Sequence, residues 1–135
     1  MNMFKSYWCL GAVAAVGVGA MTGSALAHHS FAAYDMSRTL SAEGTLKEFR
    51  WGAPHSSMVL IYLEKGKPKE MSVVSGSPLM FSKQGLTPRD FRRGDKVNVT
   101  YHPNISGLPG GAMSTIRLPN GKSFSDTEAA RAGGN

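Results

Sequence analysis

The sequence is poor in cysteine, which limits the chemistry open to the protein. Its one cysteine, Cys9, lies near the N-terminus, ahead of most of a short apolar run. The rest of the chain has no thiol, so disulfides, thiolate metal sites and cysteine nucleophilic catalysis are excluded there. The sequence also lacks a phosphate-binding loop, because Pro109-Gly110-Gly111 is not followed by lysine, and no nucleophile elbow surrounds its serines.

Acidic residues are scarce as well. Nine Asp and Glu face 15 Lys and Arg, for a formal net charge of +6. A basic protein outside the cytoplasm meets anionic lipid head groups, polysaccharides and acidic proteins more often than nucleic acid. Tyr62 is the only aromatic residue in the central predicted strands, whereas single-strand binding needs stacked aromatics. We therefore expect an anionic envelope component or a protein as partner, and no nucleic acid.

Long hydrophobic runs are missing too. The apolar stretch from Cys9 to Ala20 follows Lys5 and is too short to span a bilayer with ease. Ala25-Leu26-Ala27 then fits the small-x-small rule for cleavage. The pattern predicts a signal peptide over residues 1–27, cleavage after Ala27, a periplasmic or secreted location and no stable membrane span after cleavage. An uncleaved membrane anchor is the alternative.

The remaining chain has the alternation and turn signals of a β protein. Leu40 to Trp51 is a long predicted strand in which the apolar positions change parity, which indicates a β-bulge near Lys47 or Glu48. Further strands are predicted over 58–63, 69–75, 96–102 and 113–118, with a short strand through Phe124. The residues expected to be buried are Leu60, Ile61, Val73, Phe81, Val97, Val99 and Ile116.

One short helix interrupts the strands. Ser77 as N-cap, Pro78 at the first helical position and Gly85 past the end predict a helix over 78–84. The order of strands and helix predicts an all-β fold: a five-stranded OB-like β-barrel with the helix between strands three and four. Other small barrels and a β-sandwich are the alternatives. We expect one domain over 28–125 and a flexible tail over 126–135.

Three stretches carry a resemblance: "HHSFAAYD", "EGTLKEFRWGAPHSS" and "FRRGDKVNVTYHP". They resemble a family of small exported bacterial proteins of unknown function whose mature chain starts His-His-Ser-Phe. The resemblance covers nearly the whole chain after residue 27. It implies an exported small β-barrel and implies no particular activity.

The predicted cleavage makes His28 the first residue of the mature chain. The free amine of an N-terminal histidine lies close enough to its own ring to chelate one metal ion through both. Imidazole suits copper, zinc and nickel. With one further imidazole, this chemistry resembles the histidine brace of copper-resistance periplasmic proteins and copper monooxygenases, so copper is the favoured ion.

The second arm of such a site has to come from another histidine. His55, in a turn after Pro54, is preferred, and His102, at the end of a strand, is the alternative. His29 points away from His28 in an extended chain and is less suited. Asp35 is a candidate for orienting a histidine ring, as carboxylates do around metals, or else caps a local turn.

Three functions remain open at this point. The first is an exported metal-binding carrier or sensor, with copper favoured. The second is a metal-free ligand- or partner-binding OB-type module, with the histidines as ordinary surface and turn residues. The third, a copper oxidase or oxygenase, is the least favoured because nothing in the sequence identifies a substrate.

Overall fold

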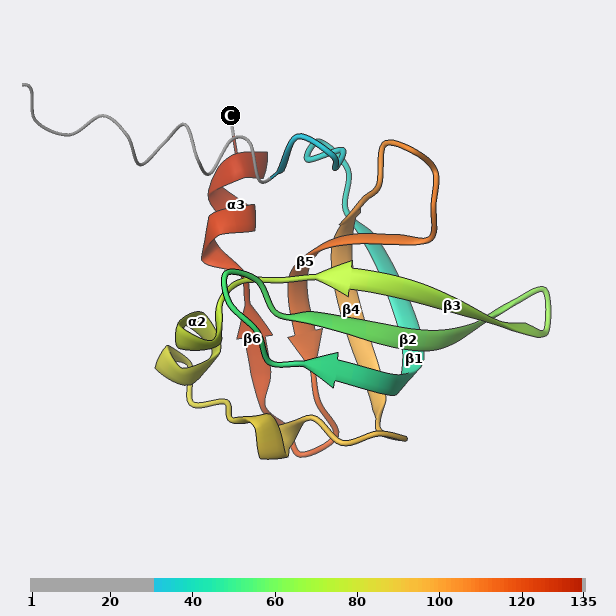
Figure 1. The fold of residues 1–135 in the computed structure, drawn as a ribbon. Helices are drawn as coiled ribbons and strands as arrows, with labels where there is room; N and C mark the ends of the chain where they lie inside the picture. The colour runs from blue at the N-terminus through green and yellow to red at the C-terminus, as the bar shows by residue number, and fades with distance from the viewer. Residues whose placement is uncertain (1–30, 135) are drawn as a thin grey trace, which may run out of the picture.

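The computed structural model describes residues 31–134, so the predicted signal peptide, His28 and His29 lie outside the described residues. Figure 1 shows a curved sheet that closes on itself, with short helices at its ends. The elements in chain order are β1 (Leu40–Arg50), β2 (Ser57–Glu64), β3 (Lys67–Val74), α2 (Pro78–Lys83), η1 (Pro88–Asp90), β4 (Lys96–Pro103), β5 (Gly110–Arg117), β6 (Ser123–Ser125) and α3 (Thr127–Gly133).

The sheet closes into a five-stranded barrel. Its strand order is β3-β2-β1-β4-β5-β6, and the additional parallel pairing of β3 with β5 joins the two ends of the five-stranded part. This is the predicted OB-like barrel with a helix after the third strand, and the prediction is confirmed. The short β6 extends the sheet beyond the barrel by pairing with β5.

Two glycines make the closure sterically feasible. Gly110 pairs with Ser72 and has φ of 98°, and a Cβ there would lie 1.9 Å from the Ser72 carbonyl oxygen. A Cβ on Gly111 would lie 1.9 Å from the carbonyl oxygen of His102 on the other neighbouring strand. Any side chain at these positions would push the strands apart.

Strand β1 is shared between the two sides of the barrel. Residues Leu40–Thr45 pair with β4, and residues Thr45–Arg50 pair with β2. The register with β2 shifts between Leu46 and Glu48, so the predicted bulge near Lys47 or Glu48 is confirmed. The bulge keeps Leu46 and Phe49 on the core side although they are three residues apart.

The barrel interior holds the core. Six of the seven residues predicted to be buried are buried: Leu60, Val73, Phe81, Val97, Val99 and Ile116. Ile61 is the exception, because it points to the outer face of β2 and stays partly exposed. An aromatic cluster closes one end, where Phe49 stacks on Phe91 and Phe81 stacks on Phe124. The helix α2 contributes Phe81 to this cluster, although Ser77 makes no side-chain cap hydrogen bond.

The C-terminal segment differs from the flexible tail expected over 126–135. Residues Thr127–Gly133 form helix α3, and the side chain of Asp126 caps it by accepting hydrogen bonds from the backbone N–H groups of Glu128 and Ala129, both 3.0 Å. Ala129 is fully buried, which anchors the helix against the barrel. No helix among residues 31–134 has the length and apolar character needed to cross a membrane.

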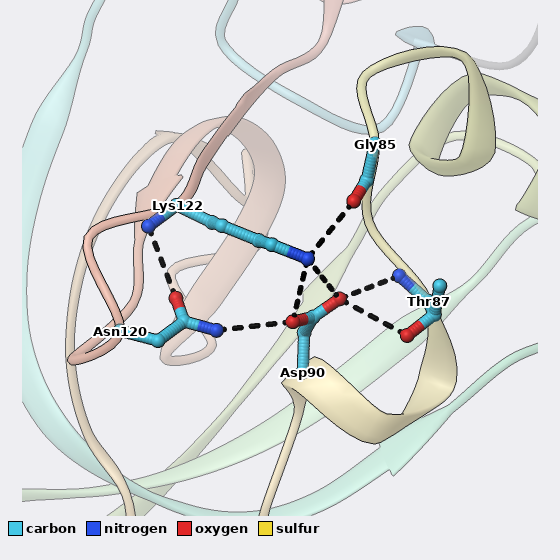
Figure 2. A network of polar contacts seen from close by, with 5 residues as sticks. All are labelled: Gly85, Thr87, Asp90, Asn120 and Lys122. Atoms are coloured by element: carbon cyan, nitrogen blue, oxygen red, sulfur yellow. Dashed lines mark hydrogen bonds and ion pairs between the residues drawn. The ribbon is translucent and has the colours of Figure 1, made fainter.

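A polar network fixes the turns at the end of the barrel near η1. Figure 2 shows Asp90 at its centre, in contact with Lys122, Asn120 and Thr87. The Lys122 ammonium lies 2.9 Å from the Asp90 carboxylate and also donates to the Gly85 carbonyl oxygen. These hydrogen bonds, with the largest effect from Lys122, lower the pKa of Asp90 from 3.8 to about 2.

We expect Val99→Asp to unfold the barrel. The Val99 side chain is fully buried, so the substitution places an unpaired charge in the core and should cost more than about 4 kcal/mol. Urea denaturation and far-ultraviolet circular dichroism would measure this. Asn98→Asp, on the exposed face of the same strand, is the matched control and should remain folded; a folded, stable Val99→Asp protein would contradict the strand assignment.

We expect Asp90→Asn to lower the thermal midpoint at neutral pH. The folded-state pKa of Asp90 lies below its ordinary value, so the ionised carboxylate stabilises the fold above pH 3.8. This contribution is lost as the pH falls from 3.8 to about 2, and the midpoints of wild type and variant should converge there. A difference that stays constant down to pH 2 would show that the carboxylate charge has no part in the network.

Candidate functional site

A small cavity of about 70 Å³ lies between the segment that precedes β1 and the start of α3. The β1–β2 loop and the ends of β3 and β5 complete its walls. Its lining residues are Phe31, Tyr34, His55, Val74, Ser75, Gly76, Ala112, Asp126 and Glu128. These include one imidazole and two carboxylates but no lysine or arginine, so the described lining favours a cation over an anion.

His55 reaches this cavity from the loop between β1 and β2. The loop contains a cis peptide bond between Ala53 and Pro54. The next residue, Ser56, is fully buried and fixes the loop through its backbone: its N–H donates to the Gly76 carbonyl oxygen and its own carbonyl accepts from Ser75, both at 2.8 Å. His55 itself is exposed, and its ring makes no hydrogen bond with the described residues.

Asp126 and Tyr34 line the same cavity. Asp126 is buried, and besides capping α3 it accepts a long hydrogen bond of 3.4 Å from the Ser75 hydroxyl. Burial raises the pKa of the Tyr34 hydroxyl above 10.0, so this group remains a proton donor at neutral pH. Neither these two residues nor Glu128 was predicted from the sequence as part of a site. The signal for Asp126 was the Asp-Thr-Glu start of a short run of helix-forming residues.

His102 lies elsewhere and is used structurally. It sits on the outer side of β4 at the end of this strand, yet only 5% of it is exposed. Its Nδ1 lies 2.8 Å from the Arg38 carbonyl oxygen, to which it donates, while its Nε2 is buried without a partner among the described residues. Helix α3 covers the ring, because a Cβ on Gly133 would lie 3.5 Å from its Cε1. Helix α3 lies in the segment that was expected to be a flexible tail, and it accounts for the burial of the His102 ring.

Asp35 forms a local turn. Its carboxylate accepts hydrogen bonds from the hydroxyl of Ser37 at 2.6 Å and from the backbone N–H of Ser37 at 3.2 Å. The Ser37 hydroxyl is the main reason that the pKa of Asp35 is lowered, and Arg38 and His102 add to the effect. The His102 ring donates to the Arg38 carbonyl oxygen, and among the described residues no hydrogen bond joins it to the Asp35 carboxylate.

The structure brings His55 close to the N-terminal segment and leaves His102 outside that cavity. Within residues 31–134 no group of three or more His, Cys, Asp or Glu side chains is arranged to hold a metal ion. His28 and His29 lie outside the described residues.

The sequence matches a known protein family. Residues 15–113 match a family described as "Family of unknown function (DUF6152)". The chain belongs to this family. The match agrees with the predicted membership of an uncharacterised family. No match was found among curated proteins.

Two solved structures are similar in fold to this chain. One is Rim1, the mitochondrial single-stranded DNA-binding protein of S. cerevisiae, with 14% identity and a TM-score of 0.47, covering 61% of this chain and 93% of that one. The other is a ZRD-deleted mutant of TiaS in complex with agmatine, with 14% identity and a TM-score of 0.47, covering 69% of this chain and 27% of that one.

The first similarity corrects one prediction. The sequence led us to exclude nucleic acid as a partner, and this exclusion is contradicted because Rim1 is itself a single-stranded DNA-binding protein. At 14% identity the likeness concerns the fold, and no nucleic-acid site is inferred from it for this chain.

We expect Asp126→Ala to loosen α3 while the barrel stays folded. The substitution removes the N-cap acceptor of the Glu128 and Ala129 N–H groups and should cost about 0.5–2 kcal/mol. Urea denaturation gives the energy, and hydrogen exchange at Ala130, whose N–H bonds to the Asp126 carbonyl oxygen, reports on the helix. Unchanged exchange at Ala130 would contradict the role of this cap.

Proposed function

We propose that this protein is exported to the periplasm or beyond and binds a metal ion, with copper favoured, through the amine and ring of His28 and the ring of His55. In this proposal the domain acts as a metal carrier or sensor and not as an enzyme. The proposal extends the family membership, which carries no function of its own.

One observation carries the proposal: Phe31 and His55 line the same cavity. Phe31 is only three residues after His28, and three residues of chain span at most about 11 Å. In this proposal the amine of a chain that starts at His28 is within reach of the cavity that His55 lines.

The surroundings of the two histidines support the choice of His55 over His102. The His55 ring is exposed and makes no hydrogen bond with residues 31–134, so it can turn toward a metal ion at little cost. The His102 ring is covered by α3 and donates to Arg38, and it would have to leave this contact to bind an ion in the cavity. The carboxylates of Asp126 and Glu128 add negative potential at the same place.

Copper follows from the donor set. An amine and two imidazoles are nitrogen ligands, which suit Cu(II) in a square-planar or tetragonal arrangement. Two of the three donors belong to one residue, so little ordering entropy is lost when they bind together.

A metal-free ligand-binding module is the second candidate. A concave surface of about 620 Å³ runs along the outside of β1, between the end of β2 and the start of β4. It is lined by polar, charged and apolar residues that include Glu43, Leu63 and Lys96. This surface lies on other elements than the His55 cavity, so its occupancy would not depend on copper.

The test compares two forms of one domain. Protein exported by its native route should have the intact mass of residues 28–135. A form with one extra Met ahead of His28 keeps every histidine but converts the amine to an amide. Because loss of an outer-shell partner already costs 10–100-fold in metal affinity, loss of a direct ligand should weaken Cu(II) binding at least about tenfold.

Single substitutions then identify the second arm. His55→Ala should weaken Cu(II) binding at least about tenfold in a competition titration, whereas His102→Ala should not. Equal affinity of the native and Met-extended proteins would overturn the role of the amine. If neither histidine substitution matters, the metal is not held by a second arm from the barrel, and the ligand-binding module becomes the better reading.

A further inference from the structure

Three large apolar side chains stand in solvent on two loops of the barrel. Leu63 is 72% exposed near the tip of the β2–β3 hairpin, and Ile105 and Leu108 are 67% and 69% exposed in the loop between β4 and β5. Leu40 and Leu79 are the other large hydrophobic residues exposed among residues 31–134; Leu79 lies on α2, and Leu40 is at the start of β1, opposite Tyr101. Such a concentration at one place marks an interaction surface more often than scattered exposure does.

The two loops lie at the same end of the barrel. Strand β5 runs parallel to β3 with Gly110 beside Ser72, so the chain just before Gly110 passes alongside the part of β3 that leads back to the hairpin tip. Leu63 is opposite Pro68 at that tip. Figure 1 shows the hairpin and the β4–β5 loop projecting on the same side of the molecule. We call these two loops the apical loops.

The fold holds the β4–β5 loop in place without using its apolar side chains. Asn104 donates to the Leu108 carbonyl oxygen at 3.0 Å, and its own carbonyl oxygen accepts from Gly107 at 3.1 Å. The N–H of Ile105 donates to the Ala33 carbonyl oxygen at 3.0 Å. Polar backbone contacts therefore fix the loop, while the side chains of Ile105 and Leu108 remain free to contact a partner.

The hairpin adds positive charge beside these apolar residues. Lys65 and Lys67 flank the turn, are exposed and form no ion pair with the described residues. The two glutamates nearby, Glu64 and Glu70, pair with Lys69 and Lys47, respectively. The β4–β5 loop carries no charged residue over 103–111. Because these glutamates are already paired, Lys65 and Lys67 leave the apical loops with a net positive charge next to the three exposed apolar side chains.

We propose that the apical loops dock this protein onto an anionic lipid bilayer. Leu63, Ile105 and Leu108 enter the head-group region, while Lys65 and Lys67 approach the lipid phosphates. The three side chains project from two neighbouring loops and do not form the broad, flat patch of a protein interface, so a lipid surface suits them better. Insertion of a few apolar side chains and attraction of lysines to lipid phosphates each give only weak membrane binding. Together they hold the protein on the bilayer, as in other interfacial anchors. The docking does not depend on metal binding.

Vesicle binding tests the docking directly. The protein should sediment with vesicles that contain phosphatidylglycerol and much less with pure phosphatidylcholine vesicles. Added salt should weaken the binding without abolishing the apolar contribution. Lys65→Gln with Lys67→Gln should weaken partitioning roughly fivefold per lysine. Leu63→Ser, Ile105→Ser and Leu108→Ser combined should weaken it at least about tenfold.

The opposite end of the barrel supplies matched controls. Leu79→Ser removes an exposed leucine from α2, and Arg92→Gln with Arg93→Gln removes two exposed cations near η1. These variants should bind vesicles as the wild type does. All variants change exposed side chains, and an unchanged circular dichroism spectrum and thermal midpoint would confirm that they fold.

Three outcomes would overturn the proposal. The first is equal binding to neutral and anionic vesicles, or to neither. The second is equal loss from the apical and the control variants, which would indicate only diffuse charge attraction. The third is binding of a single-stranded oligonucleotide that the apical variants abolish while vesicle binding is unaffected, because these loops would then serve nucleic acid.

Discussion

Closure of the barrel between β3 and β5 is the constraint on which the rest of the structure depends. Three residue pairs join these strands, from Ser72 with Gly110 to Val74 with Ala112. The glycines there admit two neighbouring backbones at distances that no side chain would allow. The closure places the end of β3 and the start of β5 side by side, and these strand ends line the His55 cavity through Val74 and Ala112.

The side chains that stabilise the barrel differ from those of the proposed binding surfaces. Elements at one end hold the aromatic cluster and the Asp90 network, which stabilise turns. The His55 cavity and the apical loops are built mainly from loops, chain ends and strand ends. Binding groups on loops over a rigid barrel are a common arrangement, because the strands supply stability while the loops remain free to vary.

The sequence predicted the barrel well because its signals are local. Alternation gave the strands, the parity change near Lys47 gave the bulge, and Pro78 with Gly85 gave the helix. Ile61 was misplaced because an apolar run on both faces does not say which face is covered. The burial of His102 was missed because it depends on α3, thirty residues away, whose anchoring residue Ala129 looks unremarkable in a small and polar tail. The cavity around His55 could not be predicted for the same reason: five separate segments meet there.

The double role of β1 has a consequence for the order of folding. Its first half pairs with β4, more than fifty residues later, and only its second half pairs with the adjacent β2. The β1–β2–β3 meander is local, but the barrel cannot close until β5 has been made and has reached β3. Long-range pairings of this kind slow folding, because closing a large loop costs conformational entropy before any contact between the strands stabilises it. A chain that is still being synthesised therefore remains an open sheet until β5 is free to pair with β3.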